Sequence, residues 1–196
     1  MVTNNAPLYG PVSVSAAVDQ LKAIGIPSSK IILGVPSYGY MFYNTDGTGI
    51  GGAMEPNANF VEGTWDYQDV NITFTGNFDF THIQQAFVEG NASMDWTYEF
   101  DNVTASSYLW NKEKNLVLTY DSAQVMQIKS DYVDAEELGG MFMWDLSGDR
   151  YGELIDIMAG AEHEIEGGLS SSAVSPRESE CSRQYGQMTA WLCINM

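Results

Sequence analysis

The fold class of this chain is decided by the stretch Gly139-Gly140-Met141-Phe142-Met143-Trp144-Asp145-Leu146-Ser147-Gly148-Asp149-Arg150. A glycine pair ends an amphipathic helix, and an apolar and aromatic run follows it up to Trp144. Continuous apolar runs without polar alternation are typical of parallel strands that are covered on both faces. Ligands of such sheets lie beyond the carboxyl ends of the strands, so the run predicts a buried strand that places Trp144 where a ligand would lie.

A second strand of the same kind is predicted at Ile31-Ile32-Leu33-Gly34-Val35. It follows a helix predicted over about residues 14 to 25, in which apolar residues recur at three- and four-residue spacing and Ser13 is available as N-cap. Alternation of helices with buried strands is typical of α/β proteins. The first ten residues carry no such signal and are expected to form a loop.

Two more helices are predicted around the final strand. The first covers about residues 122 to 137, where Asp121 and Gln124 have the spacing of a capping box. The second includes Leu154, Ile155 and Met158 and is expected to pack outside the strands.

Two motifs resemble those of one known family. Gly-Gly-x-Phe-x-Trp-Asp-Leu-Ser-Gly-Asp, at residues 139–149, resembles the last barrel strand of the family 18 glycoside hydrolases, the chitinases and their relatives. Gly-Val-Pro-Ser-Tyr-Gly, at residues 34–39, resembles their seventh barrel strand. The resemblance implies an α/β fold that is part of a (β/α)8 TIM barrel, with the last two barrel strands, their helices and an α+β insertion domain between them.

The resemblance, together with a change of composition from Glu162 onward, predicts a division of the chain into four parts. The expected parts are a barrel part at 1–40, an α+β insertion at 41–112, a second barrel part at 113–161, and a flexible tail at 162–196. Two cysteines, Cys181 and Cys193, lie in the tail and could close a small disulfide loop in a secreted protein.

Five aromatic residues are candidates for contact with a sugar ligand. In the family, the residue matching Trp144 forms the floor of the subsite for the sugar whose bond is cut, and the residue matching Tyr38 faces the cleft. Tyr40 stands where many members have an arginine. Trp65 and Tyr67, in the expected insertion, are either ligand contacts or core residues, and the sequence leaves both interpretations open.

The resemblance implies that the full protein cleaves β-1,4-linked N-acetylglucosamine polymers by a substrate-assisted, retaining mechanism. The acid is the last residue of Asp-x-x-Asp-x-Asp-x-Glu, which does not occur in this chain. Asp131-Tyr132-Val133-Asp134-Ala135-Glu136 matches only the opening of that motif, with Leu138 at the acid position, and is interpreted as a solvated helix face. The chain alone is therefore expected to be inactive. The alternatives are a chitin-binding lectin of the same fold and a truncated product without activity.

Other titratable residues predict no separate site. Asp145 and Asp149 are four residues apart in one loop, which does not suit an opposed acid and base pair, and they are interpreted either as solvated loop carboxylates or as carboxylates whose hydrogen bonds set the loop. His82 and His163 are isolated, so no metal site is expected, and no cofactor is expected either.

The net charge of the chain limits the classes of partner that it can bind, and its glycosylation sequons indicate its compartment. The chain has 8 Lys and Arg against 26 Asp and Glu, a net charge of -18, which disfavours nucleic acid and membrane surfaces but suits neutral chitin or chito-oligosaccharide. Asn71, Asn91 and Asn102 begin glycosylation sequons, which indicate secretion, yet no signal peptide is recognised. We therefore expect Met1 to be internal to a longer, extracellular parent that is monomeric as a full domain.

Overall fold

The structure is a computed structural model that describes residues 1–44, 47–53, 63–65, 75–90 and 93–160. These residues belong to one compact unit, Met1–Gly160. Its helices and helical turns are α1 (Val14–Ala23), η1 (Ser28–Lys30), α2 (Phe80–His82), the π-helical η2 (Ile83–Val88), η3 (Ser93–Asp95), α3 (Ala123–Ala135), η4 (Leu146–Gly148) and α4 (Glu153–Met158). Its strands are β1 (Ile32–Pro36), β2 (Tyr38–Tyr43), β3 (Asn77–Asp79), β4 (Thr97–Asp101), β5 (Ser106–Asn111), β6 (Leu116–Tyr120) and β7 (Gly140–Trp144).

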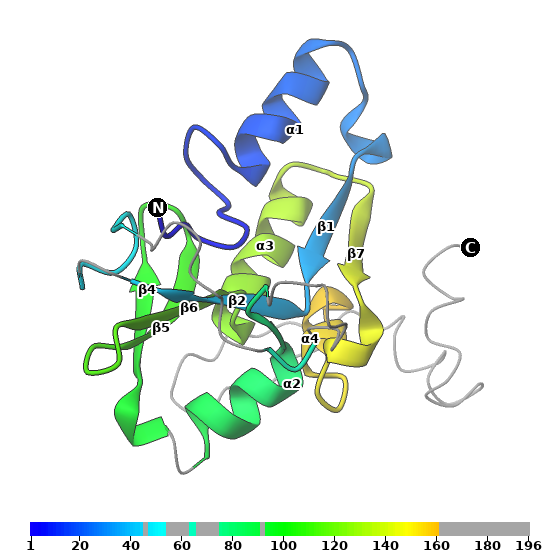
Figure 1. Ribbon diagram of the computed structural model, residues 1–196. Coiled ribbons are helices and arrows are strands. Elements are labelled where there is room, and N and C mark those ends of the chain that lie inside the picture. The colour runs from blue at the N-terminus through cyan, green and yellow to red at the C-terminus, as the bar shows by residue number, and fades with distance from the viewer. Residues whose placement is uncertain (45–46, 54–62, 66–74, 91–92, 161–196) are drawn as a thin grey trace. The chain divides into compact units, whose positions relative to one another are not determined.

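The two strands predicted from apolar runs pair with each other. Strands β1 and β7 lie side by side and parallel, in a register that runs from Ile32 opposite Gly140 to Pro36 opposite Trp144 (Figure 1). Their carboxyl ends therefore meet at one edge, where Pro36 and Trp144 stand. This pairing and the surrounding helices confirm the α/β class.

The middle of the chain forms an antiparallel sheet of five strands in the order β3-β2-β6-β5-β4. It begins at Tyr38, whereas β1 ends at Pro36. The chain therefore passes from the parallel pair into this sheet across Ser37 alone. It includes β6 (Leu116–Tyr120), which ends just before α3. The sheet thus extends beyond both ends of the segment 41–112.

A core fills the space between the parallel pair, the antiparallel sheet and the last two helices. Leu33 and Val35 of β1 are buried in it, and Met141 and Met143 of β7 pack against it. The other members are residues of β2, β3, α2, η2, β5, β6, α3 and α4, among them Met41, Phe78, Phe80, Ile83, Leu109, Leu118, Tyr120, Met126, Val133, Leu154 and Ile157. Burial of these side chains holds the loops beyond Pro36 and Trp144 on a rigid base.

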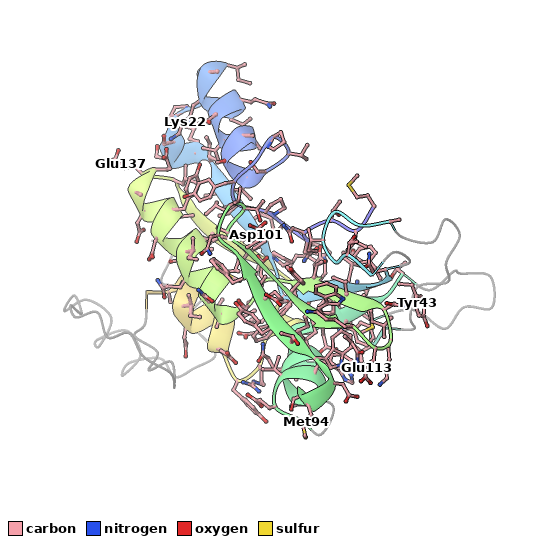
Figure 2. All side chains as sticks on the ribbon, turned by 90° about the vertical axis from the view of Figure 1, so that its left-hand side faces the viewer. Lys22, Tyr43, Met94, Asp101, Glu113 and Glu137 are labelled. Atoms are coloured by element: carbon pink, nitrogen blue, oxygen red, sulfur yellow. The ribbon has the colours of Figure 1, made fainter. Side chains whose placement is uncertain are left out.

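The first helix packs on a second, smaller cluster. Leu8, Val18, Ile31 and Tyr132 bury their side chains there, so the N-terminal loop and α1 are fixed against α3. Lys22, at the end of α1, pairs with Glu136 beyond α3 at 2.5 Å, and Figure 2 shows Lys22 near the neighbouring Glu137. The first residues form a loop, as predicted, although Leu8 is completely buried.

The predicted helices are confirmed, and one predicted cap is wrong. Ser13 caps α1, and its Oγ accepts a hydrogen bond from the amide of Ala16 at 3.2 Å. Helix α3 is capped by Ser122, whose Oγ accepts from the amide of Val125, and not by Asp121. The carboxylate of Asp121 instead lies inside the core against the ammonium of Lys129. The capping-box spacing failed as a guide because a buried cation competes for that carboxylate.

The prediction that the last strand is covered on both faces is also wrong for the described residues. Helices α3 and α4 cover the face that carries Met141 and Met143, whereas Phe142 and Trp144, on the opposite face, are 48% and 67% exposed. On β1, Ile32 shares that opposite face and is 48% exposed. The apolar run therefore reflects two apolar faces, of which the described elements cover one.

Among the described residues, no helix is both long and apolar enough to span a bilayer.

Candidate ligand-binding site

A hollow of about 250 Å³ lies at the carboxyl ends of the two parallel strands. Its lining comes from the N-terminal loop, from both strands and from the first residue of the antiparallel sheet. The lining residues are Asn5, Ala6, Gly34, Val35, Pro36, Tyr38, Phe142 and Trp144. The hollow is thus mainly apolar and aromatic, with an amide and a phenol as its polar side chains, which suits a neutral ligand better than a charged one.

Trp144 presents the largest flat surface in this hollow. Its indole is 67% exposed. Its backbone is held by β1 and by Ser37, the residue that follows β1. The amide of Ser37 donates to the carbonyl of Trp144 at 3.1 Å, and Pro36 stands opposite Trp144 in the strand register. The peptide bond between Trp144 and Asp145 is cis. An exposed indole on a fixed backbone can stack on an apolar face of a ligand.

Tyr38 joins this hollow to a group of aromatic rings. Its ring meets that of Tyr40 edge-on, with 5.5 Å between centroids, and that of Trp65 at a tilt of 43° with 5.9 Å between centroids. Burial raises the pKa of Tyr38, and the neighbouring Tyr40 raises it further. The Tyr38 phenol therefore stays protonated at neutral pH, with its hydroxyl hydrogen-bonded to Tyr40.

The structure brings together part of the predicted set. Trp144 and Tyr38 line the same hollow. Tyr40 and Trp65 contact Tyr38 but are not among the lining residues. Tyr67 lies outside the described residues, as do His163, Cys181 and Cys193. Of the sequons, those at Asn71 and Asn91 also lie outside them, whereas Asn102 is exposed in the turn between β4 and β5.

Asn5 is a lining residue that was not among the predicted site residues. Its Nδ2 donates to the carbonyl of Tyr38 at 3.0 Å, so the N-terminal loop is tied to the start of β2. The segment that begins with Asn5 precedes the first helix, and nothing in its periodicity marks it as part of a site. Only its place in the fold brings it beside Tyr38.

The carboxylates beyond Trp144 make hydrogen bonds that set the loop, which is one of the two interpretations that the sequence left open. Asp145 accepts from the amide and the hydroxyl of Ser147, at 2.8 and 2.5 Å. Asp149 accepts from the amides of Leu154 and Ile155, at 2.9 and 3.2 Å, and so caps the start of α4. These hydrogen bonds tie Asp145 to Ser147 of its own loop and Asp149 to the first turn of α4.

The acidic stretch at the end of α3 is a solvated face, also as predicted. Asp131 and Asp134 are exposed, and the side chain of Gln127 donates to Asp131 at 2.9 Å. In the described part of the chain, no group of three or more His, Cys, Asp and Glu side chains has an arrangement that could hold a metal ion.

Comparison with known proteins identifies relatives of this chain. The sequence model for glycosyl hydrolases family 18 matches residues 1–149. Chitinase A1 of Niallia circulans is 28% identical over 160 residues, which cover 75% of this chain and 21% of that protein.

Solved structures agree with the sequence comparison. A chitinase from Rhizomucor miehei superposes with a TM-score of 0.70 at 27% identity, over 81% of this chain and 48% of that one. A family 18 chitinase from Cycas revoluta, solved in complex with (GlcNAc)4, superposes with a TM-score of 0.62 at 25% identity, over 81% of this chain and 42% of that one. The chain thus spans less than half the length of these relatives.

Proposed function

Because the chain belongs to glycosyl hydrolase family 18, we propose that it forms the part of a chitinase that holds the polymer beside the bond to be cut. The polymer is β-1,4-linked N-acetylglucosamine. One observation carries the proposal: Trp144 is 67% exposed at the carboxyl end of β7 and lines a hollow together with Tyr38. Exposing an indole costs hydrophobic free energy, which a sugar ring stacked on it would offset.

Each candidate residue has a role in this proposal. Trp144 is the floor under one sugar, because the axial C–H bonds of a pyranose pack well on a flat aromatic face. Tyr38 forms the wall, from which its phenolic oxygen accepts a hydrogen bond from the ligand. Tyr40, Trp65 and Tyr67 extend that wall along the polymer, since the first two already contact Tyr38.

The chemical step we propose is a retaining, substrate-assisted hydrolysis. The acetamide of the substrate attacks the anomeric carbon, and a carboxylic acid protonates the leaving oxygen. The motif that supplies this acid in the family does not occur in the 196 residues, so this chain contributes binding and no catalytic residue. The supporting observation is that Asp145 and Asp149, the carboxylates nearest to Trp144 in sequence, are already hydrogen-bonded, the first to Ser147 of its loop and the second to the start of α4.

The proposal includes a division of the chain. We propose that β1 and β7 are the last two strands of a TIM barrel and that the antiparallel sheet is the core of an insertion that forms one wall of the cleft. We keep the division expected from the sequence, at 1–40, 41–112, 113–161 and 162–196, with the sheet of the insertion reaching past 41–112 to Tyr38 on one side and to Tyr120 on the other. The exposed face of β1 and β7, with Ile32 and Phe142, supports the idea that further barrel strands face it.

We also propose that the protein acts outside the cell, as a monomer, on chitin or chito-oligosaccharide. The exposed sequon at Asn102 and the surplus of acidic residues, 26 against 8 basic ones, support a secreted protein that binds a neutral polymer. A lectin of the same fold is the second candidate. It is favoured by the combination of a sugar-sized hollow with the missing acid motif.

Two assays on the purified chain test the proposal. Calorimetry with the N-acetylglucosamine tetramer should show binding, and incubation with a fluorogenic chitobioside should release no fluorophore. Release of fluorophore would contradict the assignment of a binding role alone. Absence of binding at millimolar tetramer would contradict the proposed site. Restored hydrolysis on addition of a barrel half that carries the acid motif would favour the chitinase over the lectin.

A further inference from the structure

Ser37 is a completely buried polar residue at the junction of the two sheets. It is the one residue between β1 (Ile32–Pro36) and β2 (Tyr38–Tyr43), and its exposed fraction is 0%. Its carbonyl accepts from the amide of Phe80, at the start of α2, at 2.8 Å. The residue therefore has a fixed position relative to both sheets and to the first turn of α2.

The remaining polar groups of Ser37 bind the backbone of the loop that carries the exposed indole. Its amide donates to the carbonyl of Trp144 at 3.1 Å, and its hydroxyl donates to the carbonyl of Asp145 at 2.5 Å. One residue thus binds two consecutive carbonyls, that of Trp144 in the Trp144–Asp145 peptide and that of Asp145 in the peptide that follows. This pair of hydrogen bonds fixes the orientation of the Trp144–Asp145 peptide plane. It also fixes the backbone position from which the Trp144 side chain extends.

The same residue is packed against the return of the loop. A Cβ added to Gly148 would lie 2.4 Å from the carbonyl oxygen of Ser37, 2.5 Å from its Oγ and 2.9 Å from the Cη2 atom of Trp65. Only a glycine fits between Ser37 and the indole of Trp65. Ser37 is therefore adjacent to the backbone of Trp144 and Tyr38, and it reaches Trp65 through Gly148.

We infer that Ser37 is a positioning residue for the ligand: its hydroxyl fixes the Trp144 loop so that the indole stays in the hollow that Tyr38 also lines. The inference rests on the proposed binding of chito-oligosaccharide. It assigns no contact between Ser37 and the sugar, because Ser37 is fully buried. The hydroxyl acts by keeping an exposed side chain in one orientation before the ligand arrives, which lowers the ordering cost of binding.

Thr81 of α2 offers a matched control, because it binds the same loop at another residue. Its hydroxyl donates to the carbonyl of Gly148 at 3.1 Å, four residues beyond Trp144. Loss of this hydrogen bond loosens the return of the loop but leaves both carbonyls at Trp144 and Asp145 bound. A general effect of loop stability would appear equally in variants at both positions, whereas a positioning effect would appear at Ser37 only.

The test compares Ser37→Ala with Thr81→Val in the full chain. The indole Nε1–H signal of Trp144, assigned through a Trp144→Phe spectrum, is followed by ¹H–¹⁵N heteronuclear NOE. The Kd for the N-acetylglucosamine tetramer is measured by calorimetry. Ser37→Ala should lower the NOE and raise the Kd by about three- to tenfold, which corresponds to one hydrogen bond of net stabilisation. Thr81→Val should leave the NOE unchanged and the Kd within about twofold of wild type.

Two results would overturn the inference. One is an unchanged NOE and Kd in Ser37→Ala, and the other is an equal loss in both variants. If Ser37→Ala does not fold, Ser37→Cys keeps the volume with a weaker donor and should give a smaller change in the same direction. Failure of the wild-type chain to bind the tetramer would count against the proposed function, while the NOE comparison would still decide the role of Ser37.

Discussion

The ring of Phe142 lies across the backbone of Gly34 on the neighbouring strand. The two residues are partners in the parallel register of β1 and β7, and a Cβ added at position 34 would stand 2.8 Å from the Cζ atom of the ring. Phe142 is 48% exposed and lines the same hollow as Trp144. Gly34 thus gives the phenylalanine room to lie flat, and this keeps the hollow open.

The first prediction concerns Gly34→Ala. The half-exposed ring can turn away at a cost of about 1 kcal/mol or less in folding free energy, because the clash is with the far end of a side chain. The turned ring fills part of the hollow, so the affinity for the N-acetylglucosamine tetramer should fall roughly fivefold. Calorimetry and thermal unfolding measure the two effects. In a Phe142→Ala background, Gly34→Ala should have no further effect on binding, and an equal loss there would exclude the ring as its cause.

Much of the fold near the site can be predicted from local sequence. The apolar runs that contain Leu33 and Met141 predict β1 and β7, and three- and four-residue spacing predicts α1 and α3. Ser13 is a correct cap because its hydroxyl acts within one turn of its own helix. These features depend on neighbours along the chain.

The features that local sequence does not predict depend on distant parts of the chain. Ser37 binds a carbonyl 108 positions away, and Asn5 binds one 33 positions away, so neither has a local pattern. Asp121 has the spacing of a cap, but it lies against Lys129 inside the core. The order of the five-stranded sheet is likewise set by long-range packing, which periodicity does not encode.

The second prediction concerns the buried ion pair of Lys129 and Asp121, whose side chains are 0% and 3% exposed. Lys129→Met leaves a carboxylate in the core without its cation and should destabilise the fold by about 3–5 kcal/mol in urea unfolding. Burial raises the pKa of Asp121, against the opposing effect of Lys129, so that variant should take up a proton there.

A second pair provides the control. Lys114 and Asp95 are 61% and 53% exposed, so Lys114→Met should change the free energy of unfolding by less than about 0.5 kcal/mol. Removing both charges of the buried pair, in Lys129→Met with Asp121→Leu, should recover much of the lost stability. Equal effects of the two lysine variants would contradict the importance of burial.

The third prediction is a pH dependence at the turn between β4 and β5. Burial alone would raise the pKa of Asp101, but hydrogen bonds from the hydroxyl of Thr104 at 2.6 Å and the amide of Val103 at 2.9 Å outweigh it, so the pKa lies below the ordinary 3.8. Because the folded-state pKa is lowered, the stabilisation is present above pH 3.8 and is lost as the pH falls through the folded-state value. Figure 2 shows Asp101 on its strand.

The measurement is chemical unfolding of wild type and Asp101→Asn at pH 7 and at acidic pH. The difference between the two proteins should be largest at neutral pH and should shrink as Asp101 becomes protonated. A difference that stays constant with pH would show that the charge of Asp101 contributes nothing.

The fourth prediction concerns Asn102, which is exposed beside Val103, itself 80% exposed. Secretion from a eukaryotic cell should add a glycan to this sequon, because the turn is accessible. Intact-mass analysis before and after treatment with an amidase that removes N-glycans would detect it, and Asn102→Gln should abolish it at this site. An unmodified Asn102 in secreted protein would contradict the prediction.

The most direct test of the account is the affinity of Trp144→Ala for the N-acetylglucosamine tetramer. Because the indole is 67% exposed, its removal should change the melting temperature by no more than about 2 °C, while loss of the stacking surface should weaken binding at least about tenfold. Tyr151→Ala, which removes an aromatic ring that is 92% exposed after the same loop, is the control and should bind as wild type does. Unchanged affinity in Trp144→Ala, in a chain whose wild type binds the tetramer, would contradict the assignment of Trp144 as the floor of the site.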